Sequence, residues 1–219
     1  MEYILRYLVL IFFDMEGLSM LFFGHIGITT GAFLLADSVS AKLTHRYASN
    51  PKGENQGISN RLRKIDSIIR EVDMRIIMVG SLLPDIIDKP LGHYLLKDFF
   101  SNGRIFSHSL LFLILISLIG LVFYKTRRRT WMLALAFGTF IHLILDQMWE
   151  APSTLLWPVY GWAFPREDVS NFIPKILHAM VTVPADYISE LFGLAILIYF
   201  FVRLVRQKKL TEFLKHGRF

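Results

Sequence analysis

Cysteine is absent from the 219 residues, and charged residues make up only 19% of them. The first absence excludes disulfide bonds and thiolate chemistry, so any bound metal would be held by imidazole and carboxylate groups. The low charge, with a hydrophobic share of 53% gathered into long runs, is not typical of a soluble domain. The sequence therefore predicts an integral membrane protein.

Three signatures of membrane enzymes are also missing. The chain has no HExxH motif of intramembrane metalloproteases, no GxSG motif of rhomboid-type serine proteases and no PSGH element of acid-phosphatase-type lipid phosphatases. It has no internal repeat and no low-complexity tract. The His and Asp residues are therefore the main guide to function.

Long apolar runs define the expected fold. Each run is close to the length of about 17–25 residues that a membrane helix needs. The runs are residues 17–36, 74–90, 108–124, 131–148 and 188–205. We predict an all-α fold, a polytopic membrane helical bundle of about five transmembrane helices that forms a single membrane-embedded domain over residues 1–219.

The basic residues indicate how this bundle is oriented. Most of the 24 Lys and Arg residues lie in 37–75, 125–129 and 203–219, which share one side of the membrane if the spans alternate. By the positive-inside rule that side is cytoplasmic. We expect a multi-pass protein of the cell membrane with a cytoplasmic C-terminus and membrane lipids as partners. No nucleic acid partner is expected, and the oligomeric state stays open.

Three of the regions outside the expected spans have a predicted character. Residues 1–16 are expected to form an interfacial helix or an extension, with Met15 or Met20 as an alternative start. Residues 37–73 form the expected cytoplasmic loop, whose second half has the apolar spacing of an amphipathic surface helix. Residues 149–187 form an outer loop that is rich in Pro and Trp.

Ionisable residues gather at the outer end of the expected spans. Hydrocarbon makes such groups costly, so they indicate a functional site by default. His142 and Asp146 are one helical turn apart on the fourth span, and so are Asp186 and Glu190 at the start of the fifth. The remaining members at similar depth are His25, Asp85, Asp88 and His108.

Crowded carboxylates in a low-dielectric pocket cannot all stay ionised without a compensating cation. A divalent metal supplies that charge, and imidazole with carboxylate suits zinc or a similar first-row ion. We therefore predict a divalent metal, zinc first and in unknown number, and hydrolysis of a phosphoester. The predicted metal ligands are His25, Asp85, Asp88, His108, His142, Asp146, Asp186 and Glu190.

Simpler explanations and a second function remain open. His25 can be a core histidine, His108 a cap of the third span and Asp85 a helix N-cap. The alternative function is a proton- or ion-coupled transporter that uses the same groups as a relay. That class predicts ionisable groups at all depths, whereas inner halves such as 31–35 and 116–122 carry none.

Three ordered motifs resemble a known family. They are Gly80-Ser-Leu-Leu-Pro-Asp85-Ile-Ile-Asp88-Lys-Pro90, Gly103-Arg-Ile-Phe-Ser-His108-Ser and His142-Leu-Ile-Leu-Asp146, followed by Leu155-Leu-Trp-Pro158. From about Gly24 to Gly193 the chain resembles the membrane-bound metal-dependent hydrolase family, also described as LexA-binding, inner membrane-associated hydrolases. The resemblance implies a hydrolase of open substrate with a metal site at His25, Asp85, Asp88, His108, His142 and Asp146.

The spacing of the two aspartates departs from that family. Many members separate them by one residue, whereas Ile86 and Ile87 both intervene here. We therefore expect only one of Asp85 and Asp88 to bind metal, and the other to act as a base or as a supporting group. The order of the His and Asp residues is also similar to that of zinc-dependent phospholipase C and single-strand nucleases, which implies a phospholipid or a small phosphoester as substrate.

Catalytic roles are expected for Asp85, Asp88 and Arg104. An aspartate would take a proton from water, and Arg104 would bind the phosphoryl anion, because a guanidinium grips phosphate in a bidentate way. The simpler alternative is that Arg104 is a surface arginine.

Overall fold

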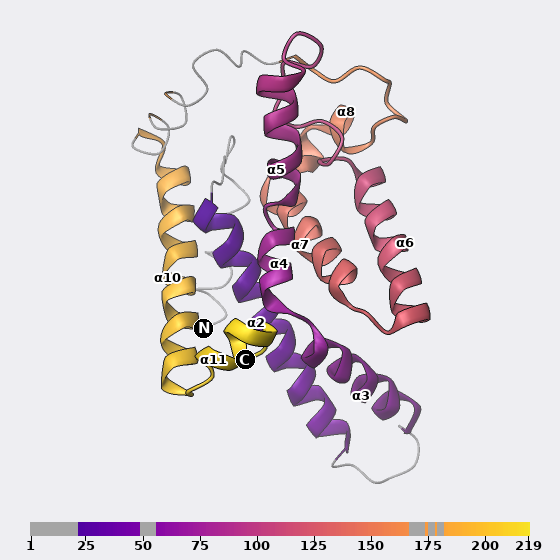
Figure 1. Cartoon of the computed structure of the whole chain (residues 1–219), viewed down its shortest axis with the longest axis vertical. Coiled ribbons are helices and arrows are strands. Elements are labelled where there is room, and N and C mark those ends of the chain that lie inside the picture. Colours follow the sequence, from indigo (N-terminus) through magenta and orange to yellow (C-terminus); the bar gives the residue numbers. More distant parts are fainter. Residues whose placement is uncertain (1–21, 49–55, 167–173, 175–177, 179–181) are drawn as a thin grey trace.

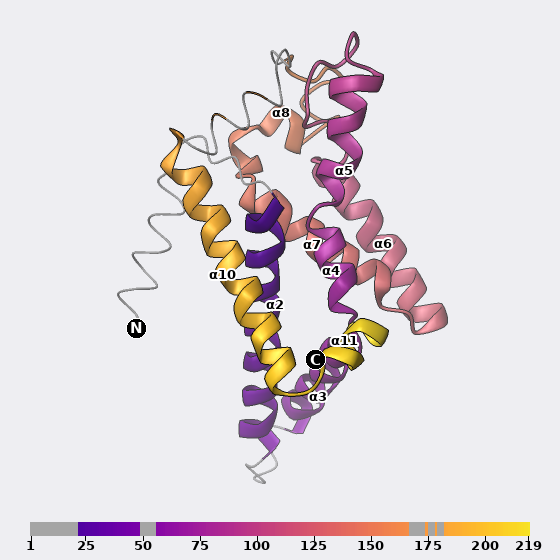
Figure 2. The same cartoon turned by 60° about the vertical axis from the view of Figure 1, so that its left-hand side comes forward.

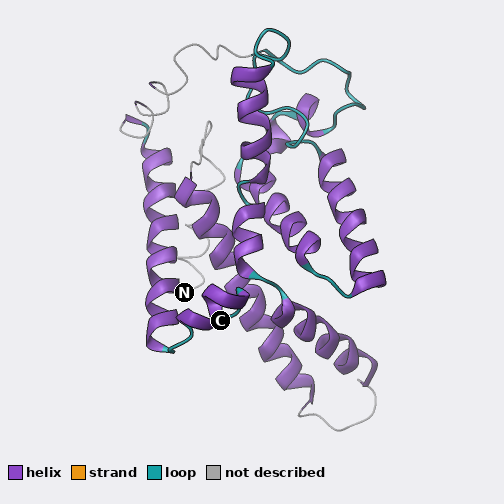
Figure 3. Cartoon of the chain, viewed as in Figure 1, coloured by secondary structure: helices purple, strands orange, loops and turns teal. Residues whose placement is uncertain are grey.

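Helices dominate the molecule (Figure 1). The computed structural model describes residues 22–48, 56–166, 174, 178 and 182–219, and within them it contains helices and no strands (Figure 3). Three helices are long and apolar enough to cross a bilayer, and a fourth is apolar but shorter. They are α2 (Phe22–Ala48), α6 (Leu110–Arg127), α10 (Pro184–Arg206) and the shorter α7 (Trp131–Leu145). The predicted all-α membrane bundle is confirmed, and the segment 1–16 lies outside the described residues.

The second predicted span, residues 74–90, is not one continuous helix. It consists of α4 (Met74–Gly80) and α5 (Leu83–Pro90), and the α-helix is interrupted for the two residues between them. Pro84 explains the interruption, because its nitrogen has no hydrogen to donate to the Gly80 carbonyl and its ring would clash there. The expected continuous helix is therefore wrong, since hydropathy does not register a proline.

The helices alternate in direction. In Figure 1, α2 runs downward, α4 and α5 upward, α6 downward, α7 upward and α10 downward. Helix α10 packs along α2, as Figure 2 shows, and α7 packs against α4 and α6. The starts of α2, α6 and α10 and the end of α7 therefore lie in one half of the bundle, called the upper half below.

Helices α4 and α7 approach each other closely at Gly80 and Gly138. A Cβ atom on Gly80 would lie 2.6 Å from the carbonyl oxygen of Leu135, and one on Gly138 would overlap the carbonyl of Ile77. Small residues of this kind let two membrane helices come into backbone contact. The contact brings the next turn of α7, which carries His142, against the interruption between α4 and α5.

An apolar core fills the lower half of the bundle. Its buried members are Phe33, Leu34, Met74, Ile77, Ala134, Phe200 and Leu204. The amphipathic helix α3 (Gln56–Glu71) and the C-terminal helix α11 (Leu210–His216) pack around this core. Helix α3 confirms the amphipathic helix predicted in the loop 37–73. However, α2 extends into that loop as far as Ala48, and α3 packs beside the extension.

Candidate metal centre

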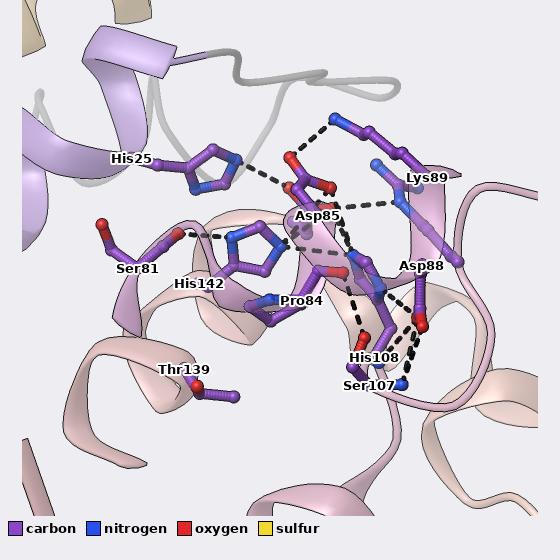
Figure 4. Close-up of polar contacts among 12 residues, drawn as sticks. His25, Ser81, Pro84, Asp85, Asp88, Lys89, Ser107, His108, Thr139 and His142 are labelled. Carbon is purple, nitrogen blue, oxygen red and sulfur yellow. Dashed lines mark hydrogen bonds and ion pairs between the residues drawn. The ribbon is translucent and has the colours of Figure 1, made fainter. Parts of the chain in front are cut away.

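Four side chains converge in the upper half of the bundle. Asp85 comes from α5, His108 from the loop just before α6, and His142 and Asp146 from the last turn and the C-cap of α7. One nitrogen or oxygen atom of each lies within 4.8 Å of the other three, and both histidines are fully buried (Figure 4). We refer to these four residues, all of them predicted ligands, as the four-residue cluster.

Hydrogen bonds assign the protons of the two cluster histidines. His142 Nδ1 lies 2.7 Å from the carbonyl oxygen of Ser81, and His108 Nδ1 lies 2.7 Å from Asp88 Oδ2. Because a carbonyl or carboxylate oxygen accepts, each Nδ1 carries the hydrogen, and in a neutral ring each Nε2 presents a lone pair. The two Nε2 atoms face each other at 3.2 Å. Lone pairs at this distance repel unless a cation or a proton lies between them.

Five of the six distances among the four atoms are close to those around a tetrahedral metal. Asp85 Oδ1 lies 3.6 Å from His108 Nε2 and 3.9 Å from His142 Nε2. Asp146 Oδ2 lies 3.7 and 3.8 Å from the same two nitrogens. Tetrahedral zinc with bonds of about 2.0–2.2 Å holds its ligand atoms roughly 3.3–3.6 Å apart. Asp85 Oδ1 is also buried without a hydrogen-bond partner among the described residues, so the residues present fit a divalent metal.

The interruption between α4 and α5 supplies the carbonyl that orients His142. Pro84 has no N–H for the carbonyl of Gly80, and the interruption also leaves the carbonyl of Ser81 available to α7. Thr139 Oγ1 donates to the carbonyl of Gly80 at 3.3 Å, and His142 Nδ1 donates to that of Ser81 at 2.7 Å. The interruption of the helix therefore sets which nitrogen of His142 faces the cluster.

Asp88 lies behind His108. Its fully buried carboxylate accepts hydrogen bonds from His108 Nδ1 and from the backbone N–H groups of Ile105, Ser107 and His108. Both carboxylate oxygens take part in these bonds. Of the two aspartates, the structure therefore brings Asp85 into the cluster, while Asp88 holds His108 and the loop before α6 in position.

His25 borders the cluster from α2. Its ring stacks on that of His142, with centroids 4.2 Å apart and planes inclined by 21°. Its Nε2 lies 3.2 Å from Asp146 Oδ1, whereas the other oxygen, Oδ2, faces the cluster histidines. His25 therefore orients Asp146 and lies outside the set of four mutually close atoms.

Glu190 acts on the start of α2. Its carboxylate oxygens accept hydrogen bonds of 2.9 Å from the backbone N–H groups of Phe23 and Gly24. These donors belong to the first turn of α2, where N–H groups have no partner within the helix. Glu190 thus caps the helix that carries His25 and is not part of the cluster. Asp186 lies on α10, but its side chain is outside the described residues.

Two partly exposed cations pair with the cluster carboxylates. Lys89 Nζ lies 2.6 Å from Asp85 Oδ2, and Arg104 Nε lies 3.0 Å from Asp146 Oδ2. The lysine and arginine side chains are 31% and 36% exposed, against 14% and 5% for their partners. Asn102 fixes the backbone here, because its side chain accepts the N–H of Arg104 at 2.7 Å. Both cations therefore stand between the buried cluster and the surface.

A comparison with protein families agrees with the membrane fold. Residues 20–210, which include the whole cluster, match the family described as YdjM inner membrane protein. The chain belongs to this family. The membrane location predicted from composition is thereby confirmed, while the family description names no reaction. No curated protein and no solved structure matches the chain.

In this YdjM-family chain, sequence reasoning found the cluster and missed residues that support it. Lys89 was not predicted, although its position four residues after Asp85 on a helix is a signal for an ion pair. Pro84 could have indicated freed backbone carbonyls. Ser81 carries no such signal, because it acts through its backbone oxygen.

Proposed function

We propose that the protein is a membrane-bound metal-dependent hydrolase that cleaves a phosphoester, with a phospholipid as the first candidate substrate. The observation that carries this proposal is the pair of Nε2 atoms of His108 and His142, which face each other at 3.2 Å beside two carboxylates. Imidazole and carboxylate ligands of this kind hold zinc in hydrolases. The residues that would hold the cation are Asp85, His108, His142 and Asp146.

The roles of the aspartates follow from their contacts. A divalent cation at the cluster supplies Lewis-acid activation of water and of a phosphoryl oxygen. Asp85 would hold the cation through Oδ1, which faces the two histidines, so its other oxygen, Oδ2, is the candidate general base. Asp88 was also expected to be catalytic, but its two oxygens already accept N–H groups, so we assign it to fixing His108.

Arg104 favours an anionic substrate. Its Nε pairs with Asp146, while its terminal amino groups make no hydrogen bond to the described residues and can reach a phosphoryl oxygen. A guanidinium beside a metal centre stabilises the charge that develops on a phosphoryl group. A phosphoester therefore suits this site better than a neutral ester or an amide.

The position of the site in the bundle favours a lipid substrate. The basic helix α3, the Arg-rich turn between α6 and α7, and α11 lie at the lower end, away from the cluster (Figure 1). By the positive-inside rule the lower end would be cytoplasmic and the site would face outward. In the upper half, Trp149 and Trp162 are 45% and 78% exposed, as expected of rings at the lipid headgroup level.

A proton- or ion-coupled transporter is the alternative function. It needs ionisable groups across the full depth of the bundle. Among the described residues, the buried Asp, Glu and His side chains all belong to the upper half, and they are His25, Asp88, His93, His108, His142, Asp146 and Glu190. A hydrolytic centre needs only such a local group, so we favour the hydrolase.

Elemental analysis of detergent-purified protein tests the metal centre. We expect bound metal, zinc first, in the wild type and in the control His45→Ala, whose ring is exposed at the far end of α2. His142→Ala and Asp85→Ala should lose the metal, because each removes one of the four ligands. Negligible metal in all four proteins would reject the proposal.

Turnover of phospholipids tests the reaction. The wild type should cleave a short-chain phospholipid, a chelator should stop the cleavage, and added zinc should restore it. The His142→Ala variant should stay inactive after zinc is added. A zinc-loaded wild type that cleaves neither phospholipids nor simple phosphodiesters would refute the proposed substrate class.

A further inference from the structure

Lys89 makes a contact that metal binding alone does not explain. Its Nζ lies 2.6 Å from Asp85 Oδ2, while Oδ1 of the same carboxylate faces the two cluster histidines. The lysine and the metal-binding atoms therefore use different oxygens of one carboxylate. Figure 4 shows the lysine reaching over Asp85 on the side away from His142. Arg104, from the loop before α6, differs in that it pairs with Asp146 Oδ2, the same oxygen that faces the two histidines.

The two ion pairs balance the charge of the cluster before any cation is added. Asp85 and Asp146 carry two negative charges, Lys89 and Arg104 carry two positive charges, and neutral imidazoles add none. The buried Asp88 behind the cluster adds one negative charge. A divalent cation would raise the local charge to about +1, in a site of low dielectric constant where such an excess is costly. An anionic ligand would remove that excess.

We propose that Lys89 and Arg104 together form the phosphoryl-binding subsite of this centre. Asp85 and Asp146 hold the two cationic side chains in place until an anionic ligand replaces the carboxylates as their partner. The proposal rests on the function proposed above and adds Lys89 to the residues that contact the substrate. Both side chains are partly exposed, so they can turn from a carboxylate to an incoming anion without unfolding the site. His25 would still hold Asp146 once Arg104 turned away.

The charge of Lys89 should affect the affinities for the metal cation and for the phosphoryl anion in opposite directions. A lysine next to the cluster repels a divalent cation and attracts a phosphoryl anion, because both interactions depend on the same positive charge. Removing the charge should therefore strengthen metal binding and weaken anion binding. A lysine that served only to stabilise the fold would weaken both.

Calorimetric titration of the full chain in detergent micelles measures both affinities. Zinc is titrated into chelator-treated protein, and inorganic phosphate is then titrated into the zinc-loaded protein. For Lys89→Met we expect zinc to bind about tenfold tighter and phosphate about tenfold more weakly, since the lost charge is close but partly screened by solvent. Lys89→Arg should keep both affinities near wild type. Lys97→Met, which removes an exposed lysine nearby in sequence, is the matched control.

The outcomes separate the two proposals. Zinc binding by the wild type, with phosphate affinity unchanged or with both affinities weakened in Lys89→Met, overturns the subsite and leaves the hydrolase intact. A wild type that binds no zinc overturns both. A change of equal size in Lys97→Met also overturns the subsite, because it would reflect the net charge of the protein.

A second arm identifies the source of the phosphoryl group. Short-chain phosphatidylglycerol, presented in the same micelles, replaces inorganic phosphate in the titration. Tighter binding of the lipid, weakened by Lys89→Met, supports a lipid headgroup, whereas binding of inorganic phosphate alone, weakened in the same way, supports a soluble phosphoester. Binding of neither anion to the zinc-loaded wild type overturns the subsite.

Discussion

The substitution Asp88→Asn tests whether Asp88 binds the metal itself or only positions His108. The sequence allowed Asp88 to bind metal, whereas the structure shows its carboxylate accepting N–H groups from His108, Ile105 and Ser107. Asparagine has almost the same shape but only one acceptor oxygen. If that oxygen replaces Oδ2, the new amide group faces the N–H of Ser107, which is shared between Oδ1 and Oδ2 at 3.1 Å from each. Two donors would then oppose each other in a buried loop.

The expected cost follows from these bonds. A hydrogen bond to a charged acceptor contributes about 1.5–3 kcal/mol, and one to a neutral acceptor about 0.5–1.5 kcal/mol. The shared bond from Ser107 loses its Oδ1 half and the bonds to Oδ2 weaken, so we expect the free energy of unfolding to fall by about 1–3 kcal/mol. Zinc should still bind, about 10–100-fold more weakly, because a neutral amide oxygen holds the His108 ring less strongly than the carboxylate does.

Two measurements check this reasoning. Denaturation in detergent gives the change in the free energy of unfolding, and zinc titration gives the affinity. The control is Asp98→Asn, which changes an exposed carboxylate and should leave both unchanged. Complete loss of zinc from a folded Asp88→Asn protein would show that Asp88 is itself a ligand. Unchanged zinc affinity would show that the hydrogen bond to His108 is irrelevant to the centre.

Two further substitutions test how the helices hold the cluster. Gly138→Ala should force α7 away from the carbonyl of Ile77 and lower the free energy of unfolding by about 1–3 kcal/mol. Zinc binding should also weaken, since His142 moves with α7. An unchanged free energy of unfolding together with an unchanged zinc affinity would contradict the close contact. Glu190→Ala leaves two N–H groups at the start of α2 without their acceptor, so we expect a loss of about 2–4 kcal/mol. Zinc affinity should change less than in His142→Ala, and a complete loss of zinc from the folded protein would instead make Glu190 a ligand.

The sequence predicted the membrane bundle because a bilayer permits few solutions. An apolar run in hydrocarbon must satisfy its backbone within a helix, so composition and run length were enough to predict α2, α6, α7 and α10. The same rule failed at Pro84, where one residue interrupts the helix and the average hydropathy hardly changes. The prediction was wrong because hydropathy measures partition into lipid and not the hydrogen bonds of a particular residue.

Part of the candidate site could likewise be predicted from the sequence, and part could not. His108, His142 and Asp146 were predicted from depth and spacing, and they meet in the cluster with Asp85. Spacing could not choose between Asp85 and Asp88, because residues three apart on a helix both lie near one face. The choice depends on the loop before α6, whose N–H groups surround Asp88.

By itself, the sequence determined that helices cross the membrane and that ionisable groups gather at one depth, because the cost of burying charge in hydrocarbon acts on each residue according to its type. Only the tertiary structure decided which atoms face one another. The close packing of α7 on α4, the carbonyl of Ser81 and the cap provided by Glu190 each join segments far apart in the chain. The direction of a side chain around its helix axis depends on such partners, and local sequence does not contain them.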